Sequence, residues 1–407
     1  MAGDVAKQAD ADVVVWQDKK RYLWLLGLIA PTALLVTLPI VWAMNQAGWQ
    51  TASQVLFWIG PILLYIVLPA LDLRFGPDGQ NPPDEVTERL ENDRYYRYCT
   101  YLYIPFQYAS VVVGAYLFTA SDLSWLGFEG SLSWPAKIGL ALTVGTLGGV
   151  GINTAHEMGH KKESLERWLS KITLAQSCYG HFYIEHNRGH HVRVATPEDP
   201  ASSRFGETFW EFLPRSVFGS LRSAWRLEAQ RLRRLNKSPW HLSNDVLNAW
   251  LMSVVLWGVL IAVFGPALIP FVVIQAVFGF SLLEAVNYLE HYGLLRQKTA
   301  NGRYERCTPK HSWNSDHIVT NLFLYHLQRH SDHHANPTRR YQTLRSFPDA
   351  PSLPSGYASM IALTYVPPLW RKVMDHRVLA HYGGDITRVN VHPRRRQELL
   401  ARYGAAA

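Results

Sequence analysis

The sequence predicts an all-α polytopic membrane protein with six transmembrane helices and cytoplasmic helical segments that carry a histidine-rich metal site. Two observations predict this class. Six stretches of the chain contain no charged residue, and nine of the 17 histidines recur at short spacings outside those stretches. A helix needs about 20 apolar residues to cross the hydrocarbon core of a bilayer, and a soluble helical protein would rarely need six uncharged runs of that length. The runs are residues 22–44, 52–71, 99–119, 138–155, 246–265 and 266–283, and we expect the last helix to continue to residue 289.

The charges of the connecting segments alternate along the chain, and lysine and arginine concentrate in the cytoplasmic loops of membrane proteins. Three basic residues at 19–21 precede the first span, whereas the connection at residues 45–51 has no charge. Residues 72–98 carry four arginines, residues 120–137 carry a single lysine, and Gly265-Pro266 forms a tight fifth connection. The polar regions after the fourth and sixth spans are again basic. We therefore expect both termini and both long polar regions in the cytoplasm, where the net charge of +8 could also contact anionic lipid headgroups or an acidic partner.

We expect a single membrane domain over residues 22–398. Residues 1–21 lack the short apolar core and cleavage site of a signal peptide, so they are expected to form a cytoplasmic N-terminal segment. Residues 399–407 are expected to form a C-terminal tail or linker. The three cysteines form no Cys-x-x-Cys pair, which excludes a disulfide framework and a thiolate metal site built by this chain alone. They are Cys99, Cys178 and Cys307.

Nine histidines fall into four groups that adjoin the spans or lie in the cytoplasmic regions. On a helix, residues at i, i+3 and i+4 share one face, so the members of a group point the same way, although His191 turns to one side of its group. Because all four groups are expected on the cytoplasmic side, they can converge at one membrane face. The groups are His156 and His160; His186, His190 and His191; His291; and His330, His333 and His334.

Clustered imidazoles at these spacings indicate a metal site, since neutral imidazole suits iron, zinc, copper and nickel. Nine ligands exceed the three or four that one zinc uses, so we expect two metal ions. The other eight histidines are expected to be core or surface residues, with His326 as a hydrogen-bond donor near the site. They are His181, His241, His311, His317, His326, His376, His381 and His392.

The pentapeptide HEMGH at residues 156–160 leaves a second interpretation open. It matches H-E-x-x-H, in which two histidines hold zinc and the glutamate is the general base of a protease. Seven further clustered histidines argue against an intramembrane zinc protease, and the sequence PDG at residues 77–79 precedes this span rather than following it. The E-x-x-H of soluble di-iron bundles also fits, but the other groups do not repeat it.

Four motifs, HEMGHK, EHNRGHH, NYLEHYG and LQRHSDHHA, occur in this order around the six spans. Together with NDRYYRY and HSWNSDHIVTNL, they make the chain resemble the integral-membrane alkane 1-monooxygenases, which are related to xylene monooxygenase and to membrane fatty-acyl desaturases. The likeness covers nearly the whole chain. The desaturases share only the general histidine scheme, whereas NYLEHYGLLRQK and LQRHSDHHA are specific to the alkane hydroxylase branch.

The resemblance implies a non-haem di-iron centre, held by the nine clustered histidines, that uses O2 to convert medium-chain n-alkanes to primary alcohols. It also implies electrons from rubredoxin, fused or separate, supplied by an NADH-dependent rubredoxin reductase, and a location in the bacterial inner membrane. The alternatives are a fatty-acyl desaturase or a xylene-type methyl hydroxylase with the same metals. No nucleic-acid partner is expected.

Histidine ligands usually donate their outer N–H to a carboxylate, a carbonyl or water. Carboxylates that neighbour a clustered histidine in sequence, or polar residues that share a helix face with one, are therefore candidates for this role. They are Glu157, Glu185, Glu290 and Asp332 by adjacency, and Glu284, Asn153 and Asn287 by helix face.

An alkane dissolves in the bilayer, so we expect an apolar channel that opens toward lipid and ends at the metals. Bulky residues of the spans are candidates for its wall: Trp58, Leu64 and Phe278. For an acidic electron donor, the basic stretch at residues 226–237 and the pair Arg339 and Arg340 are candidate docking surfaces. The stretch at residues 226–237 fits equally a helix on anionic lipid.

Overall fold

The computed structural model describes residues 16–404, and within this range it contains helices and isolated β-bridges but no β-sheet. Six helices are long and apolar enough to cross a membrane, which confirms the predicted fold class. Each overlaps one of the uncharged runs and extends it by a few polar residues. The six spans are Arg21–Gln46, Gln50–Phe75, Arg94–Thr119, Trp134–Gly159, Asp245–Phe264 and Pro266–His291.

Several spans are interrupted by turns of different pitch. The first joins a 3₁₀ segment, Arg21–Leu28, to α1 (Ile29–Gln46). The second consists of α2 (Gln50–Ser53), a 3₁₀ turn (Gln54–Trp58), α3 (Ile59–Ile62), a π turn (Leu63–Val67) and α4 (Leu68–Phe75). The remaining spans are α6 (Arg94–Tyr101) with α7 (Tyr103–Thr119), α8 (Trp134–Gly159), α13 (Asp245–Phe264), and a 3₁₀ turn (Pro266–Leu268) with α14 (Ile269–His291).

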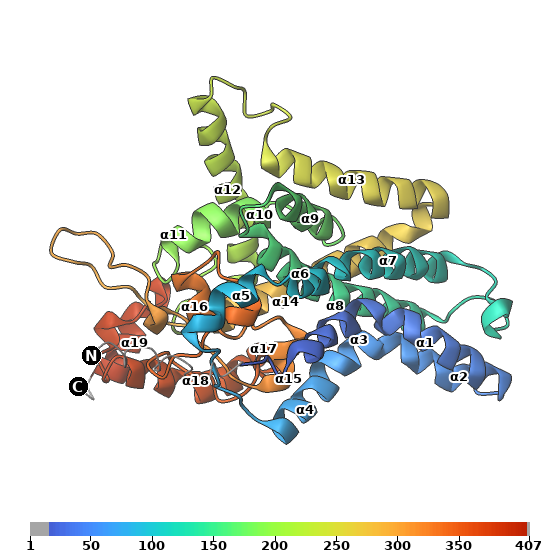
Figure 1. Ribbon diagram of the computed structural model, residues 1–407, viewed down its shortest axis with the longest axis horizontal. Helices are drawn as coiled ribbons and strands as arrows, with labels where there is room; N and C mark the ends of the chain where they lie inside the picture. The colour runs from blue at the N-terminus through green and yellow to red at the C-terminus, as the bar shows by residue number, and fades with distance from the viewer. Residues whose placement is uncertain (1–15, 405–407) are drawn as a thin grey trace, which may run out of the picture.

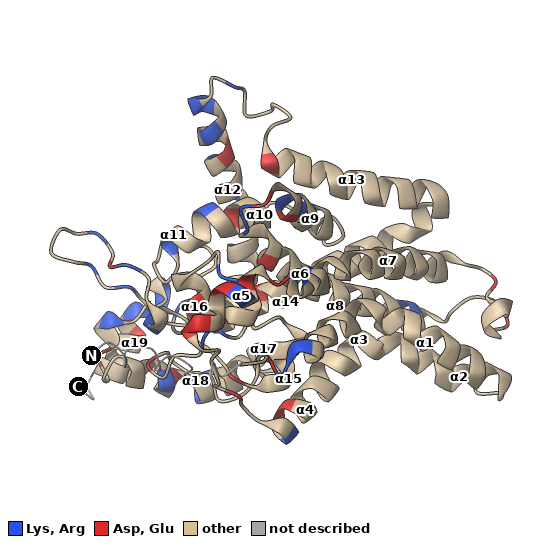
Figure 2. Cartoon of the chain, in the orientation of Figure 1, with Lys and Arg blue, Asp and Glu red and all other residues tan. Residues whose placement is uncertain are grey.

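The other helices gather at one end of the spans, which we call the polar side (Figure 1). Figure 2 shows that most of the charged residues lie on this side, whereas the distal parts of the spans carry few. Helix α12 begins in this region and leads to α13 at the edge of the molecule. The polar-side helices are α5 (Thr87–Asn92), α9 (Ser164–Leu174), α10 (Phe182–Ile184), α11 (His191–Arg193), α12 (Phe209–Arg234), α15 (Ile318–Phe323), α16 (His330–Ala335), α17 (Tyr357–Thr364), α18 (Pro367–His381) and α19 (Arg396–Tyr403).

Helix α8 forms the centre of the bundle, because 83% of its apolar membrane-spanning part is buried. It packs most closely against α14. Glycines allow this approach: a Cβ at Gly145 would lie 2.9 Å from the carbonyl oxygen of Gln275, and one at Gly149 would lie 3.1 Å from that of Gly279. Small residues four positions apart let membrane helices approach closely. The contact fixes the polar-side ends of α8 and α14, which carry His156 and His291.

The outward faces of the spans are apolar. Val36, Ile66, Val254 and Val263 are each more than 60% exposed. A contiguous exposed apolar surface of this kind belongs in hydrocarbon, where a helix keeps its backbone hydrogen bonds internal.

Candidate metal centre

The four histidine groups converge on the polar side of the bundle, where nine imidazoles form two adjacent groups. One contains five histidines and the other four, and within each group the nitrogen atoms lie within 4.8 Å of one another. The five-histidine group consists of His156, His160, His186, His191 and His333, and the four-histidine group consists of His190, His291, His330 and His334. None of the other eight histidines lies in either group.

Four elements build the five-histidine group: α8, the π turn Glu185–His190, α11 and α16. His156 and His160 leave the end of α8 one turn apart, and α16 supplies His333. The Nε2 atoms of His156 and His333 approach to 2.8 Å, and that of His191 lies 3.1 Å from Nε2 of His333. Five imidazoles therefore direct nitrogen atoms at one small volume.

A π turn, Glu185–His190, explains how one short segment serves both groups. In a π turn the hydrogen bonds link residues i and i+5, and such turns occur mostly at functional sites. His186 and His191 are five residues apart, and their Nε2 atoms lie 3.0 Å apart in the five-histidine group. His190 is left pointing to the four-histidine group. The expectation that His191 turns away from its group is therefore wrong, because His191 lies with His186 and it is His190 that lies in the other group.

The four-histidine group combines the end of α14 with α16. His291 is fully buried, and Nε2 of His330 lies 2.9 Å from Nε2 of His334. Helix α16 thus serves both groups, because His330 and His334 are one turn apart while His333 faces the other group.

The two groups have the chemistry of a metal site. Nε2 of His160, Nε2 of His190 and both nitrogens of His291 are buried and have no hydrogen-bond partner within residues 16–404. Burial and the neighbouring histidines lower the pKa of His186 and His333 well below the usual value. These imidazoles are neutral at pH 7, which leaves nitrogen lone pairs free to bind a metal. The residues therefore fit two imidazole-ligated ions.

Asp199 was missed by the sequence analysis. Its Oδ2 lies 2.9 Å from Nδ1 of His190, and Oδ2 also accepts a 2.6 Å hydrogen bond from Ser202. Burial would raise the pKa of Asp199, but His190 and Ser202 lower it to about 2. The carboxylate is therefore ionised, and it leaves Nε2 of His190 free for the site. Only its position in the acidic segment after EHNRGHH could have suggested this role.

Among the seven polar candidates named from the sequence, Glu290 is the one that contacts a clustered histidine within the described residues. Its Oε2 lies 3.1 Å from Nε2 of His330. The other six have different partners: Glu157 pairs with Lys161, Glu185 with Arg193, Asp332 with Arg339, and Glu284 with Tyr179, while the amides of Asn287 and Asn153 donate to Glu284 and to the Leu324 carbonyl. His326, expected as a donor near the site, lies 2.8 Å from the Tyr341 carbonyl through its Nδ1.

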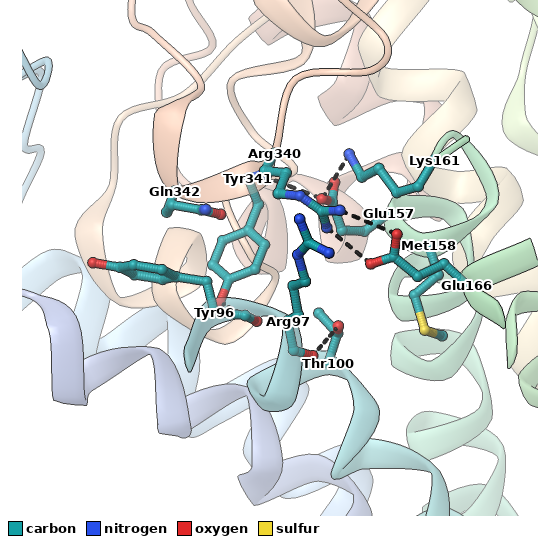
Figure 3. A pocket seen from close by; sticks show the side chains of 10 residues that line it. All are labelled: Tyr96, Arg97, Thr100, Glu157, Met158, Lys161, Glu166, Arg340, Tyr341 and Gln342. Carbon is teal, nitrogen blue, oxygen red and sulfur yellow. Dashed lines mark hydrogen bonds and ion pairs between the residues drawn. The ribbon is translucent and has the colours of Figure 1, made fainter. Parts of the chain in front are cut away.

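The carboxylate of HEMGH belongs to a buried ion network rather than to the metal site. Oε1 of Glu157 lies 2.8 Å from Nζ of Lys161, and Lys161 also donates to the Arg339 carbonyl at 2.8 Å. Figure 3 shows this pair beside Arg340, which binds Glu166 at 2.9 Å. With the glutamate neutralised in this way and both histidines in the five-histidine group, the protease arrangement is not formed.

The same network corrects one expected docking surface. Arg340 is buried and paired with Glu166 and Glu163, and Arg339 pairs with Asp332. Arg340 ties the segment after α16 to the start of α9, and Arg339 ties it to α16 itself, so the two arginines do not form a free basic surface. By contrast, the other expected docking surface, the basic stretch at residues 226–237, is exposed at Arg226, Arg233, Arg234 and Lys237.

The three expected channel residues lie in the spans. Leu64 is buried in the main apolar core, and Phe278 is half-buried against that core. Trp58 packs on Gly139, where a Cβ would lie 2.4 Å from the indole. None of the three lines the small cavity that reaches His186 and His190. Its wall includes Tyr179, Phe182, Ser220 and Glu284.

Comparison with known proteins places the chain in a family. The fatty acid desaturase family model matches residues 132–364. An alkane 1-monooxygenase of Acinetobacter baylyi is 48% identical over 391 residues, covering 95% of this chain and 92% of the relative, and one of Pseudomonas putida is 46% identical with the same coverage. The xylene/toluene monooxygenase hydroxylase component XylM of Pseudomonas putida is 30% identical over 241 residues, covering 59% of this chain and 64% of the relative. The chain therefore belongs to the alkane 1-monooxygenase family of membrane oxidoreductases.

Proposed function

We propose that the protein oxidises the terminal methyl group of medium-chain n-alkanes to a primary alcohol at two irons held by the two histidine groups. One oxygen atom of O2 enters the alcohol, and two electrons and two protons convert the other to water. The observation that carries this proposal is the convergence of nine buried histidines into two adjacent groups. The names of the relatives support the substrate.

Bound iron would supply the oxidant that an unactivated C–H bond requires, and the chain supplies ligands, positioning and exclusion of water. Neutral imidazoles hold the ions, and Asp199 fixes the orientation of His190. His156, His190 and His291 are each less than 10% exposed, so bulk water is kept from the reacting bond.

The substrate would enter from the bilayer between the apolar spans, with Trp58, Leu64 and Phe278 as wall residues. Trp58 meets α8 at Gly139, which lies about 25 Å from His156 at 1.5 Å per helical residue. A medium-chain alkane that reached the metals is too short to extend as far as Trp58. Trp58 is therefore a candidate wall residue in the part of the channel farther from the metals.

The polar side is proposed to face the cytoplasm, with the protein in the inner membrane of a bacterium and both termini on that side. Its excess of lysine and arginine supports this orientation. The exposed end of α12 is proposed to contact anionic lipid, because Trp240 and Leu242, each more than 70% exposed, follow its arginines closely. Aromatic residues at the headgroup level anchor such segments.

The electron donor is proposed to be rubredoxin, reduced by an NADH-dependent reductase, and to dock on the loop at residues 296–310. Arg303, Arg306 and Lys310 are exposed in this loop. At its base, Arg296 donates a 2.8 Å hydrogen bond to the carbonyl of Val192, the residue after His191. An acidic donor bound here would lie close to the five-histidine group.

Purified protein loaded with iron should convert octane to 1-octanol in the presence of rubredoxin, its reductase and NADH. The His291→Ala variant should insert and fold but form no octanol, whereas the exposed His376→Ala control should keep its activity. Octanol formation by His291→Ala would contradict the site. Desaturation of an acyl substrate, or methyl hydroxylation of xylene in place of octane, would favour the activity of the related families instead.

A further inference from the structure

Glu290 is an isolated carboxylate beside the four-histidine group. It lies next to His291 at the end of α14 and is 1% exposed. One oxygen, Oε2, lies 3.1 Å from Nε2 of His330. The other, Oε1, is buried and has no hydrogen-bond partner within residues 16–404.

Other buried carboxylates near the site have partners that satisfy their charge or their lone pairs. Glu157 has Lys161, and Glu284 accepts hydrogen bonds from Tyr179 at 2.7 Å and from Asn287 at 3.3 Å. No lysine or arginine in the described chain pairs with Glu290. The Tyr357 hydroxyl lies close to Glu290 and also donates to the carbonyl of Trp313 at 3.1 Å, but as a neutral group it supplies no compensating charge. An ionised carboxylate buried in this way requires a compensating charge or a metal.

The direction of the carboxylate identifies that partner. Nε2 of His330 is the atom that meets Nε2 of His334 at 2.9 Å, so it points into the four-histidine group. Nδ1 of His330 is buried without a partner. Oε2 of Glu290 therefore lies against the nitrogen that faces the metal position, rather than against the outer nitrogen that a carboxylate usually orients.

We propose that Glu290 is a ligand of the metal in the four-histidine group. This inference rests on the proposed metal pair and deepens it. The two sites then have the same number of ligand residues but different charge: five neutral imidazoles hold one ion, while four imidazoles and one carboxylate hold the other. The anionic ligand stabilises the more oxidised metal, so the two irons differ in reduction potential, and the iron near His291 is the harder to reduce.

Protein loaded with ⁵⁷Fe tests the assignment through iron content per chain and Mössbauer spectra, neither of which depends on activity. The decisive variant is Glu290→Gln, because glutamine has nearly the size and shape of glutamate but carries no charge and is a poor metal ligand. Glu284→Gln is the matched control, since it removes a buried carboxylate of the same helix that hydrogen-bond donors already satisfy.

Wild-type protein should contain two irons with two distinct quadrupole doublets. Glu290→Gln should shift or remove one doublet only, and a chelator should extract that iron at least tenfold faster than from wild type. Glu284→Gln should keep both doublets. A Glu290→Gln protein with wild-type spectra and extraction rates would overturn the ligand assignment while leaving the metal pair intact. Fewer than two irons in reconstituted wild-type protein would overturn the metal pair, and the assignment with it.

The wild-type protein provides a second readout that needs no glutamine variant. With ¹³C-labelled glutamate, the infrared difference spectrum between iron-loaded and metal-free protein should contain a carboxylate band that moves on loading. The Glu290→Asp variant, which keeps a carboxylate, should shift this band. A protonated carboxyl band that iron does not change would overturn the proposal.

Discussion

Oδ2 of Asp199 lies 2.9 Å from Nδ1 of His190 and leaves Nε2 of that imidazole without a partner. The carboxylate thus selects the tautomer that binds metal, as outer carboxylates of histidine ligands do. The Asp199→Asn variant should weaken metal binding at the four-histidine group by about 10- to 100-fold. Iron retained after dialysis against a graded chelator measures the loss. The exposed Asp349→Asn variant is the control, and equal retention by the two variants would show that Asp199 does not act on the metal.

The buried pair of Lys161 and Glu157 predicts a large loss of stability on removal of one partner. The Lys161→Met variant leaves the Glu157 carboxylate uncompensated, and breaking a buried ion pair from one side costs about 3–5 kcal/mol. The free energy of unfolding in a detergent titration should fall by this amount. The double variant Glu157→Gln/Lys161→Met should recover part of the loss. The exposed neighbour Lys162 provides a matched Lys→Met control that should change stability little.

Glu211, in the first turn of α12, predicts that the folded protein loses stability in acid. Although burial raises the pKa of Glu211, hydrogen bonds from Arg395 and Thr208 lower it from 4.5 to about 2. A carboxylate whose pKa is depressed by folding contributes stability that is present above its unfolded pKa and is lost as the pH falls through the folded value. Wild-type stability should therefore decline between about pH 4.5 and pH 2. The Glu211→Gln variant should be less stable at pH 7 and should show a smaller decline, and an unchanged pH profile would contradict this role.

The proposed rubredoxin surface predicts a charge effect on electron transfer. Reversing two exposed charges, in the Arg303→Glu/Arg306→Glu variant, should lower the apparent association rate of reduced rubredoxin about tenfold at low salt. High salt should reduce the difference, because exposed charges are screened. The matched control is Arg233→Glu/Arg234→Glu on α12, which should leave this rate unchanged. If the control variant lowered the association rate more, the docking site would lie on α12 instead.

The spans were predictable because each is an uncharged run of membrane length, and hydrocarbon tolerates few other patterns. Their ends were not: the third span begins at Arg94, where a charged and aromatic segment extends the helix beyond the apolar run. The pairing of α8 with α14 depends on close backbone contact at Gly145 and Gly149, which a single sequence does not specify.

The convergence of the histidines followed from their helical spacing, but their division between two groups did not. That division depends on the π turn at Glu185–His190, which no spacing rule for an α-helix anticipates. The contact of Asp199 with His190 depends on how the irregular segment between them folds back, and the pairing of Arg340 with Glu166 is a long-range contact of the folded chain. Adjacency in sequence was a poor guide to contact, since Glu157 and Glu185 bind cations rather than histidines.

The most direct test of the central claim is the metal content of the purified chain after growth in ample iron and iron reconstitution. Elemental analysis should find two irons per wild-type chain, and the His291→Ala variant should lose iron from the four-histidine group while it keeps the other. About one zinc per wild-type chain, with little iron even after reconstitution, would contradict a paired-iron oxygenase.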